Sequence, residues 1–193
     1  EGTSGTSYAA DVAPDGSGGV QVVWHESVWS GTSGSHGIYH RRSTDGGRTW
    51  SATTILDWAV TGSGTSLDAP AVAVRGTDVF VAWMRTPYSA TLAAYQSQPS
   101  FASSTDRGVT FGTAAQLGSF VPAAGASGDG CDVAFDSSGT VVVVAEGATT
   151  GGNAAIWCAT GTVAGLFGSP VRVSPASASS LAPRLAVVGT TNV

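Results

Sequence analysis

The chain has 193 residues, enough for one large domain or two small ones. Only 11% of them are charged and 42% are hydrophobic; all eight basic residues are arginine, and the formal net charge is −5. This balance argues against nucleic acid or an anionic membrane surface as a partner. No apolar run approaches the roughly 20 residues that cross a bilayer, so no membrane insertion is expected.

Short stretches of alternating apolar residues run through the chain, separated by Gly, Ser, Asp and Thr. The clearest are residues 20–24 (VQVVW), 79–83 (VFVAW) and 141–145 (VVVVA). Period-two stretches of this length, bounded by turn-forming residues, predict β-strands. Capped helical periodicity is absent. The sequence therefore predicts an all-β fold.

Two sequence signals repeat at the same interval. Strand-opening tripeptides centred on Val12, Val72, Val133 and Leu185 are spaced by 60, 61 and 52 residues. The octapeptide STDGGRTW at 43–50 returns as STDRGVTF at 104–111, offset by 61, and a weaker copy runs over 160–167. A shared period near 60 predicts a four-stranded unit repeated in tandem.

The octapeptide has a physical logic. Its aspartate accepts backbone N–H bonds across a tight turn, and its glycine supplies the positive φ that the turn requires. The terminal Trp or Phe is expected to fold under the turn, between sheets. The pattern S-T-D-x-G-x-T-[WF] resembles the Asp box, or BNR repeat, of the sialidase-like β-propellers, and the resemblance covers residues 8–193.

This resemblance implies a β-propeller of four-stranded antiparallel blades. The blades are expected at about 8–57, 67–117 and 130–174, with the first strand of a fourth at about 182–193. The chain would then be an incomplete six- or seven-bladed propeller, whose ring further blades or other chains complete. By the same analogy, Asp45, Trp50, Asp106 and Phe111 are structural and lie on the face away from the ligand.

The opposite face is expected to come from the loops at 25–37, 57–68, 85–97, 118–130 and 146–153. Aromatic rings beside carboxylates and an arginine suit sugar recognition, because pyranose C–H faces stack on rings while hydroxyls need polar partners. The alternative is that these aromatics pack the loops onto the blades. The candidate ligand-binding residues are Glu26, Trp29, Trp58, Asp68, Arg85, Tyr88, Asp129 and Arg184.

Metal and disulfide sites are not expected. His25 and His36 border one loop without a cysteine or a cluster of carboxylates, and His40 aligns with packing positions on the third strands of the other blades. No cofactor is predicted. Cys131 opens a first strand and Cys158 sits late on a third strand, so two strand spacings and opposite strand ends separate them. They are expected to be unbonded.

The resemblance leaves several functions open. Sialidases use a tyrosine nucleophile and an arginine trio that clamps the substrate carboxylate. No tyrosine here matches the nucleophile, and Arg85 and Arg184 are the two arginines that fit a clamp, so no catalytic residue is assigned. The preferred function is a secreted or cell-surface, non-catalytic propeller that binds glycans or an extracellular protein, or is purely structural. The alternative is an exo-sialidase-like glycoside hydrolase whose other catalytic residues lie in further blades.

Overall fold

The computed structural model describes residues 4–30, 33–91, 93–118, 120, 123–124, 130–148, 154–175 and 182–186. In these residues the backbone forms three antiparallel sheets and no helix, and therefore no helix that could span a membrane. The first sheet contains β1 (Ser4–Pro14), β2 (Val20–Ser30), β3 (Ser33–Ser43) and β4 (Thr54–Val60). The second contains β5 (Thr65–Arg75), β6 (Asp78–Ser89), β7 (Ala94–Ser104) and β8 (Ala115–Gln116), with β9 (Ala123–Ala124) also paired to β7. The third contains β10 (Cys131–Phe135), β11 (Val141–Ala148), β12 (Ala154–Gly161) and β13 (Val171–Arg172).

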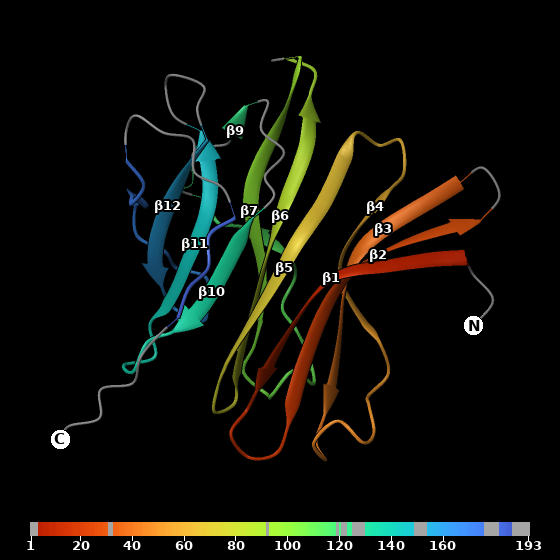
Figure 1. The fold of residues 1–193 in the computed structure, drawn as a ribbon, viewed down its shortest axis with the longest axis vertical. Helices are drawn as coiled ribbons and strands as arrows, with labels where there is room; N and C mark the ends of the chain where they lie inside the picture. Colours follow the sequence, from red (N-terminus) through yellow and green to blue (C-terminus); the bar gives the residue numbers. More distant parts are fainter. Residues whose placement is uncertain are drawn as a thin grey trace.

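The three sheets lie side by side in chain order, as Figure 1 shows. Within each sheet the four main strands are hydrogen-bonded in sequence order, so each sheet is an up-and-down meander. The first strands of the sheets are neighbours, because β5 contacts both β1 and β10. This is the arrangement of blades in a β-propeller, and the predicted fold class is confirmed.

Two apolar cores fill the spaces between the blades. Successive residues of a strand point to opposite faces of its sheet, so consecutive apolar residues give a blade two apolar faces. In the second blade, Val81 and Trp83 are buried against Val23 of the first blade. On its other face Phe80, stacked on Phe101 with ring centroids 5.0 Å apart, is buried in a core shared with the third blade. The period-two pattern therefore encodes blade-to-blade packing.

A bulge interrupts β1 and β5 at the same repeat position. The pairing register shifts after Tyr8 and after Asp68, and the alanine that follows each has a positive φ of 51°. Just after the bulge in β1, and at the matching position of β10, a carboxylate links neighbouring repeats: Asp11 accepts the Val72 N–H at 2.8 Å, and Asp132 accepts the Leu185 N–H at 2.7 Å. These bonds tie together the inner strands of adjacent repeats.

The two octapeptides form turns with the same hydrogen bonds, between β3 and β4 and between β7 and β8. Asp45 accepts from Ser43 Oγ at 2.8 Å, from the Thr49 N–H at 2.8 Å and from Thr49 Oγ1 at 2.6 Å. Asp106 accepts the equivalent three bonds. The Thr49 hydroxyl, followed by the Thr49 N–H and the Ser43 hydroxyl, lowers the pKa of Asp45 to about 2.

The aromatic residues that end these turns differ in burial. Phe111 packs between the first two blades, where it meets the His40 ring edge to face at 4.7 Å. Trp50 is 40% exposed, contrary to the expectation that it folds between sheets. It lies with Val22 and Trp24 on the face of the first blade that no other described sheet covers.

The strands run further than the apolar stretches indicated. We expected loops at 25–37 and 85–97, but β2 continues to Ser30, β3 begins at Ser33, and β6 continues to Ser89. These segments are projecting hairpins instead of loops. Both faces of such a hairpin lie partly beyond the cores, so its side chains need not alternate between apolar and polar, and the sequence pattern fades there.

Cys131 and Cys158 are free thiols on either side of β11. Cys131 pairs with Ala145, and Cys158 pairs with the preceding residue, Val144. The two cysteines therefore lie at nearly the same level of the sheet and not at opposite strand ends, so the intervening strand keeps them apart. Burial raises the pKa of the Cys131 thiol, whose Sγ donates to the Ala69 carbonyl oxygen at 3.2 Å.

Candidate functional site

The inner strands converge on a central pocket of about 160 Å³. Its walls come from the two bulges, from Asp11 of β1, from Asp132 of β10 and from Arg184. The structure thus brings together the strand-opening positions that the sequence repeat aligns. Because both carboxylates already bind backbone N–H groups of the next repeat, they act mainly as structural ties, and Arg184 is the one basic residue lining the pocket.

A cluster of polar and aromatic side chains borders this pocket, where the first blade meets the second. We call it the junction cluster; its members are Tyr8, His25, His36 and Asp68. Tyr8 and Asp68 directly precede the bulge alanines that line the central pocket. His25 and His36 lie on the blade-two side of the β2–β3 hairpin, and His36 Nε2 donates to the Thr65 carbonyl oxygen at 2.7 Å.

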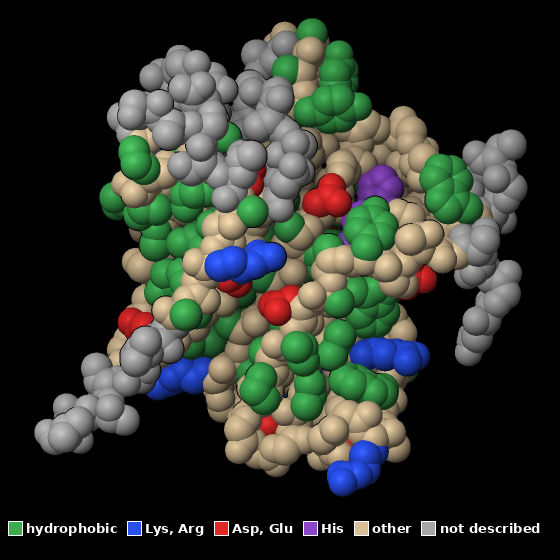
Figure 2. Space-filling model, viewed as in Figure 1, with side chains coloured by type: hydrophobic (Ala, Val, Ile, Leu, Met, Phe, Trp, Pro, Cys, Tyr) green, Lys and Arg blue, Asp and Glu red, His purple; other side chains and the backbone are tan. Residues whose placement is uncertain are grey.

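The geometry of the cluster is compact. His25 is buried, and its Nδ1 lies 3.3 Å from Asp68 Oδ1. The Tyr8 ring meets the His25 ring edge to face at 4.3 Å, and the Tyr8 hydroxyl is 3.4 Å from Ser27 Oγ. Histidine and acidic side chains lie next to apolar ones on this part of the surface, as Figure 2 shows. Aromatic surface and polar groups are therefore presented side by side.

Asp68 supplies the negative charge of the cluster. Its burial acts to raise the pKa of its carboxyl, but the adjacent His25, the Ser66 hydrogen bond and the nearby His36 together outweigh burial and hold that pKa below its ordinary value. The carboxylate is consequently ionised at neutral pH. Because 40% of the side chain remains exposed, it stays accessible to a ligand that donates hydrogen bonds.

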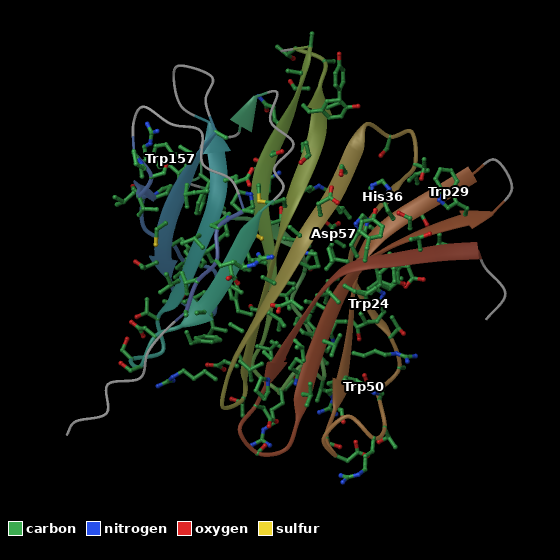
Figure 3. The ribbon with its side chains drawn as sticks, viewed as in Figure 1. Trp24, Trp29, His36, Trp50, Asp57 and Trp157 are labelled. Atoms are coloured by element: carbon green, nitrogen blue, oxygen red, sulfur yellow. The ribbon has the colours of Figure 1, made fainter. Side chains whose placement is uncertain are left out.

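Trp29 extends the same surface. It lies four residues beyond His25 on the same face of β2, roughly 13 Å along the strand, and is 47% exposed. Figure 3 places Trp29 and His36 towards one end of the first blade and Trp50 at the other. Of the eight predicted binding residues, Trp29 and Asp68 share this surface.

The other predicted residues lie elsewhere. Glu26 and Trp58 face the opposite side of the first blade, where Glu26 accepts the Trp24 Nε1–H at 2.8 Å. Tyr88 pairs with Tyr95 across the tip of the β6–β7 hairpin. Arg184 lines the central pocket. Asp129 lies outside the described residues.

Arg85 is held in an ion pair between the blades. Its Nη1 donates to Asp57 Oδ1 at 2.7 Å, and the Trp83 Nε1–H donates to Asp57 Oδ2 at 3.1 Å. The Asp57 side chain is 11% exposed, so this carboxylate joins β4 to β6 largely away from water. Arg85 therefore serves the packing of the first two blades, which limits its availability to a ligand.

Tyr8, His25 and His36 are the residues that the candidate list missed. Each histidine alone has an ordinary packing explanation, and Tyr8 precedes the first strand-opening tripeptide. The available signal was their spacing. His25 pairs with Ile38, and His36 lies two residues from Ile38 on β3, which puts the two histidines on one face of the paired strands. No group of three His, Cys, Asp or Glu side chains suited to a metal ion occurs in the described part of the chain.

The comparisons with known proteins concern structure alone. No protein-family model matches the chain, and no curated protein matches it. Its fold is similar to that of a Hadza microbial sialidase, with a TM-score of 0.64 and 16% identity over 92% of this chain and 39% of that one. It is also similar to Trypanosoma rangeli sialidase in complex with the inhibitor DANA, with a TM-score of 0.59 and 13% identity over 88% and 31% of the two chains.

These likenesses define the fold as a sialidase-like β-propeller. At such identities they establish the fold and leave activity open. The chain spans less than two fifths of the length of these sialidases.

Proposed function

We propose that this chain is a carbohydrate-binding part of an extracellular β-propeller and that it is not itself catalytic. The observation that carries the proposal is the surface at the junction of the first two blades. There, two exposed aromatic rings, Tyr8 and Trp29, lie along one face with the ionised, accessible carboxylate of Asp68. Sugars use both features, because their C–H faces stack on rings and their hydroxyls donate to carboxylates.

The sequence supports this proposal in two ways. The turns at 43–50 and 104–111 resemble Asp boxes, which in propellers of this kind are structural. The absence of lysine and the abundance of Gly, Ser and Thr suit a protein that works outside the cell.

The arginine positions argue against sialidase catalysis within this chain. All eight arginines fall in the described residues, and one of them, Arg184, lines the central pocket. Arg85 is committed to Asp57, and a carboxylate clamp of three arginines is not assembled. The alternative, a sialidase-like hydrolase completed by further blades, rests on Arg184 beside Asp11 and Asp132 and on the similarity to sialidases.

One experiment separates these functions. The purified chain is applied to a glycan array, and the same preparation is assayed with a fluorogenic sialoside. Binding without turnover supports the proposal, whereas turnover supports the hydrolase. If the chain neither binds a glycan nor turns over the sialoside, a structural role remains and the proposal is overturned.

A matched pair of variants locates the site. Asp68→Asn keeps the shape of the side chain and removes its charge, and we expect it to weaken glycan binding about tenfold. Asp78→Asn, at the other end of the second blade, is the control and leaves binding unchanged. Equal thermal melting of both variants and the wild type shows that the loss is not unfolding. Retained affinity in Asp68→Asn would place the sugar elsewhere.

A further inference from the structure

A second polar pocket lies at the opposite end of the molecule, where the octapeptide turns are. It encloses about 200 Å³ between the β1–β2 turn, the end of β3 and the β7–β8 turn of the second blade. Two arginines, Arg42 and Arg107, line it together with Thr44. Among the described residues, no side-chain hydrogen bond or ion pair engages either guanidinium.

The charge of this pocket is positive. Asp15 is the one acidic residue that lines it, and Asp15 Oδ1 already accepts the Ser17 N–H at 2.8 Å, the Ser17 hydroxyl at 2.9 Å and the Gly19 N–H at 2.8 Å. Two cations thus share the pocket with one carboxylate. Hydrogen bonds within its own turn, with a smaller contribution from the Arg107 charge, lower the pKa of Asp15, so the pocket keeps one positive charge in excess. Arg107 is exposed and Arg42 is partly buried, so an anion that reaches the pocket from solvent can meet both residues.

The backbone of Arg107 gives a second, independent indication. Arg107 has a φ of 63°, in the left-handed region where arginine is strained. The equivalent residue of the first octapeptide is Gly46, which adopts a φ of 71° without that cost. Both make the same kind of inter-turn bond: the Arg107 N–H donates to Thr77 O at 2.7 Å and the Gly46 N–H donates to Gly18 O at 2.8 Å.

The turn therefore needs no side chain at this position. Glycine satisfies the fold in the first repeat, while the second repeat carries a strained arginine that lines the pocket. Strain at a residue that the fold does not require points to a role for its side chain in binding.

We propose that this pocket binds a tetrahedral oxyanion, a sulfate or phosphate group. The two arginines come from different elements, β3 and the β7–β8 turn, so they approach an anion from two directions. That arrangement suits a group with acceptor oxygens on several sides. Each guanidinium offers a planar fork of donors to such oxygens, and the Thr44 hydroxyl adds one more. The site is separate from the junction cluster and does not depend on the proposed sugar site.

The test uses inorganic sulfate as the probe. Thermal melting of the full chain is followed with increasing sodium sulfate and with sodium chloride at matched ionic strength, and the affinity is measured by calorimetry. We expect sulfate to bind and to raise the melting temperature beyond the effect of chloride. An identical response to the two salts, with no calorimetric binding, would overturn the proposal.

Three variants make the test specific. Arg107→Gly restores the residue that the first repeat uses, so the protein should melt at the same temperature or higher without sulfate, yet bind sulfate at least about tenfold more weakly. Arg42→Gln should weaken sulfate binding similarly. Arg48→Gln is the control and should retain full sulfate affinity. In the wild type, the Arg48 guanidinium donates to the Asp45 carbonyl oxygen and does not line the pocket. Sulfate affinity that survives in Arg107→Gly would contradict the assignment.

A second arm separates the sources of the anion. A sulfated disaccharide is compared with its desulfated counterpart and with inorganic sulfate. Tighter binding of the sulfated sugar than of the free ion indicates a group carried on a glycan, and equal binding indicates the free ion. In either case, Arg107→Gly must weaken the binding at least about tenfold for the proposal to hold.

Discussion

The two ends of this molecule follow different rules. At the turn end, Asp45 and Asp106 accept the same three bonds at almost the same distances, although they belong to different blades. At the hairpin end, aligned strand positions carry unrelated residues: His25, Met84 and Glu146 are equivalent, and so are Glu26 and Arg85. Repetition at one end gives both blades the same turn, and variation at the other end gives each blade a different set of side chains.

The comparison also has an energetic side. The turn glycines have positive φ angles, and Gly108 also packs against the first blade, so side chains added there should lower stability. Hairpin-end side chains such as Trp29 and Tyr8 are about half exposed, so changes there should leave stability nearly intact and alter binding. The predictions below run from the largest expected effect on stability to the smallest.

The largest effect is expected at Gly108, in the turn of the second blade. A Cβ at this position would lie 2.6 Å from Gln21 Oε1 and 3.1 Å from His40 Cε1, at a φ of 75°. Gly108→Ala should therefore lower the free energy of unfolding by about 2–5 kcal/mol, combining left-handed strain with overpacking. Denaturant unfolding measures this.

Gly47 is the matched position in the first blade. Its φ is 87°, and the nearest atom to an added Cβ is Trp50 Cζ2 at 3.6 Å, so Gly47→Ala should cost only the strain, about 1–2 kcal/mol. If Gly108→Ala and Gly47→Ala lowered the free energy of unfolding by the same amount, the contact of Gly108 with the first blade would make no contribution to the loss.

The second effect is a dependence of stability on acid that His40 causes. His40 is fully buried, and its Nε2 donates to Gln21 Oε1 at 2.7 Å, because the Gln21 amide nitrogen is already donating to the Arg107 carbonyl oxygen. A second proton would have to sit on Nδ1, which has no partner among the described residues. Burial, with a smaller contribution from the Arg42 charge, lowers the pKa of His40 to about 4.

The sign follows from this lowered pKa. The unfolded chain binds a proton at His40 near pH 6.5 and the folded chain near pH 4, so stability is full above pH 6.5 and falls as the pH drops to 4. The loss is about 3 kcal/mol. The carboxyl of Asp45, with its pKa of about 2, loses its contribution only below about pH 3.8, in a separate window. Unfolding measured from pH 8 to 3 should show a slope between pH 6.5 and 4 that His40→Gln abolishes; an unchanged slope in this variant would exclude His40 as its cause.

The same contrast explains what the sequence could predict. The blades follow from Val12, Val72 and Val133 at one period, and the turns follow from octapeptides whose bonds are all local. The Asp57–Arg85 pair joins residues 28 apart in different blades, and no repeat signal marks it, because each blade has its own residue at the equivalent site. The junction cluster was missed for the same reason. Tyr8, His25 and Asp68 meet through the bulges, and a bulge shifts register without a distinct residue pattern.

The smallest effect on stability, and the clearest on binding, is expected at Trp29. The sequence placed Trp29 and Trp58 together in one ligand face, whereas they lie on opposite faces of the first blade and are 47% and 60% exposed. Changing either to alanine should alter the free energy of unfolding by no more than about 0.5 kcal/mol, because neither ring fills a core. Trp29→Ala should weaken sugar binding roughly tenfold, the loss expected when one stacked ring is removed, and Trp58→Ala should have no effect. Calorimetry with a sugar identified on the array decides between them. If instead Trp29→Ala destabilises the protein and leaves affinity intact, the ring serves to pack the hairpin, and the hairpin end differs from the turn end in sequence alone.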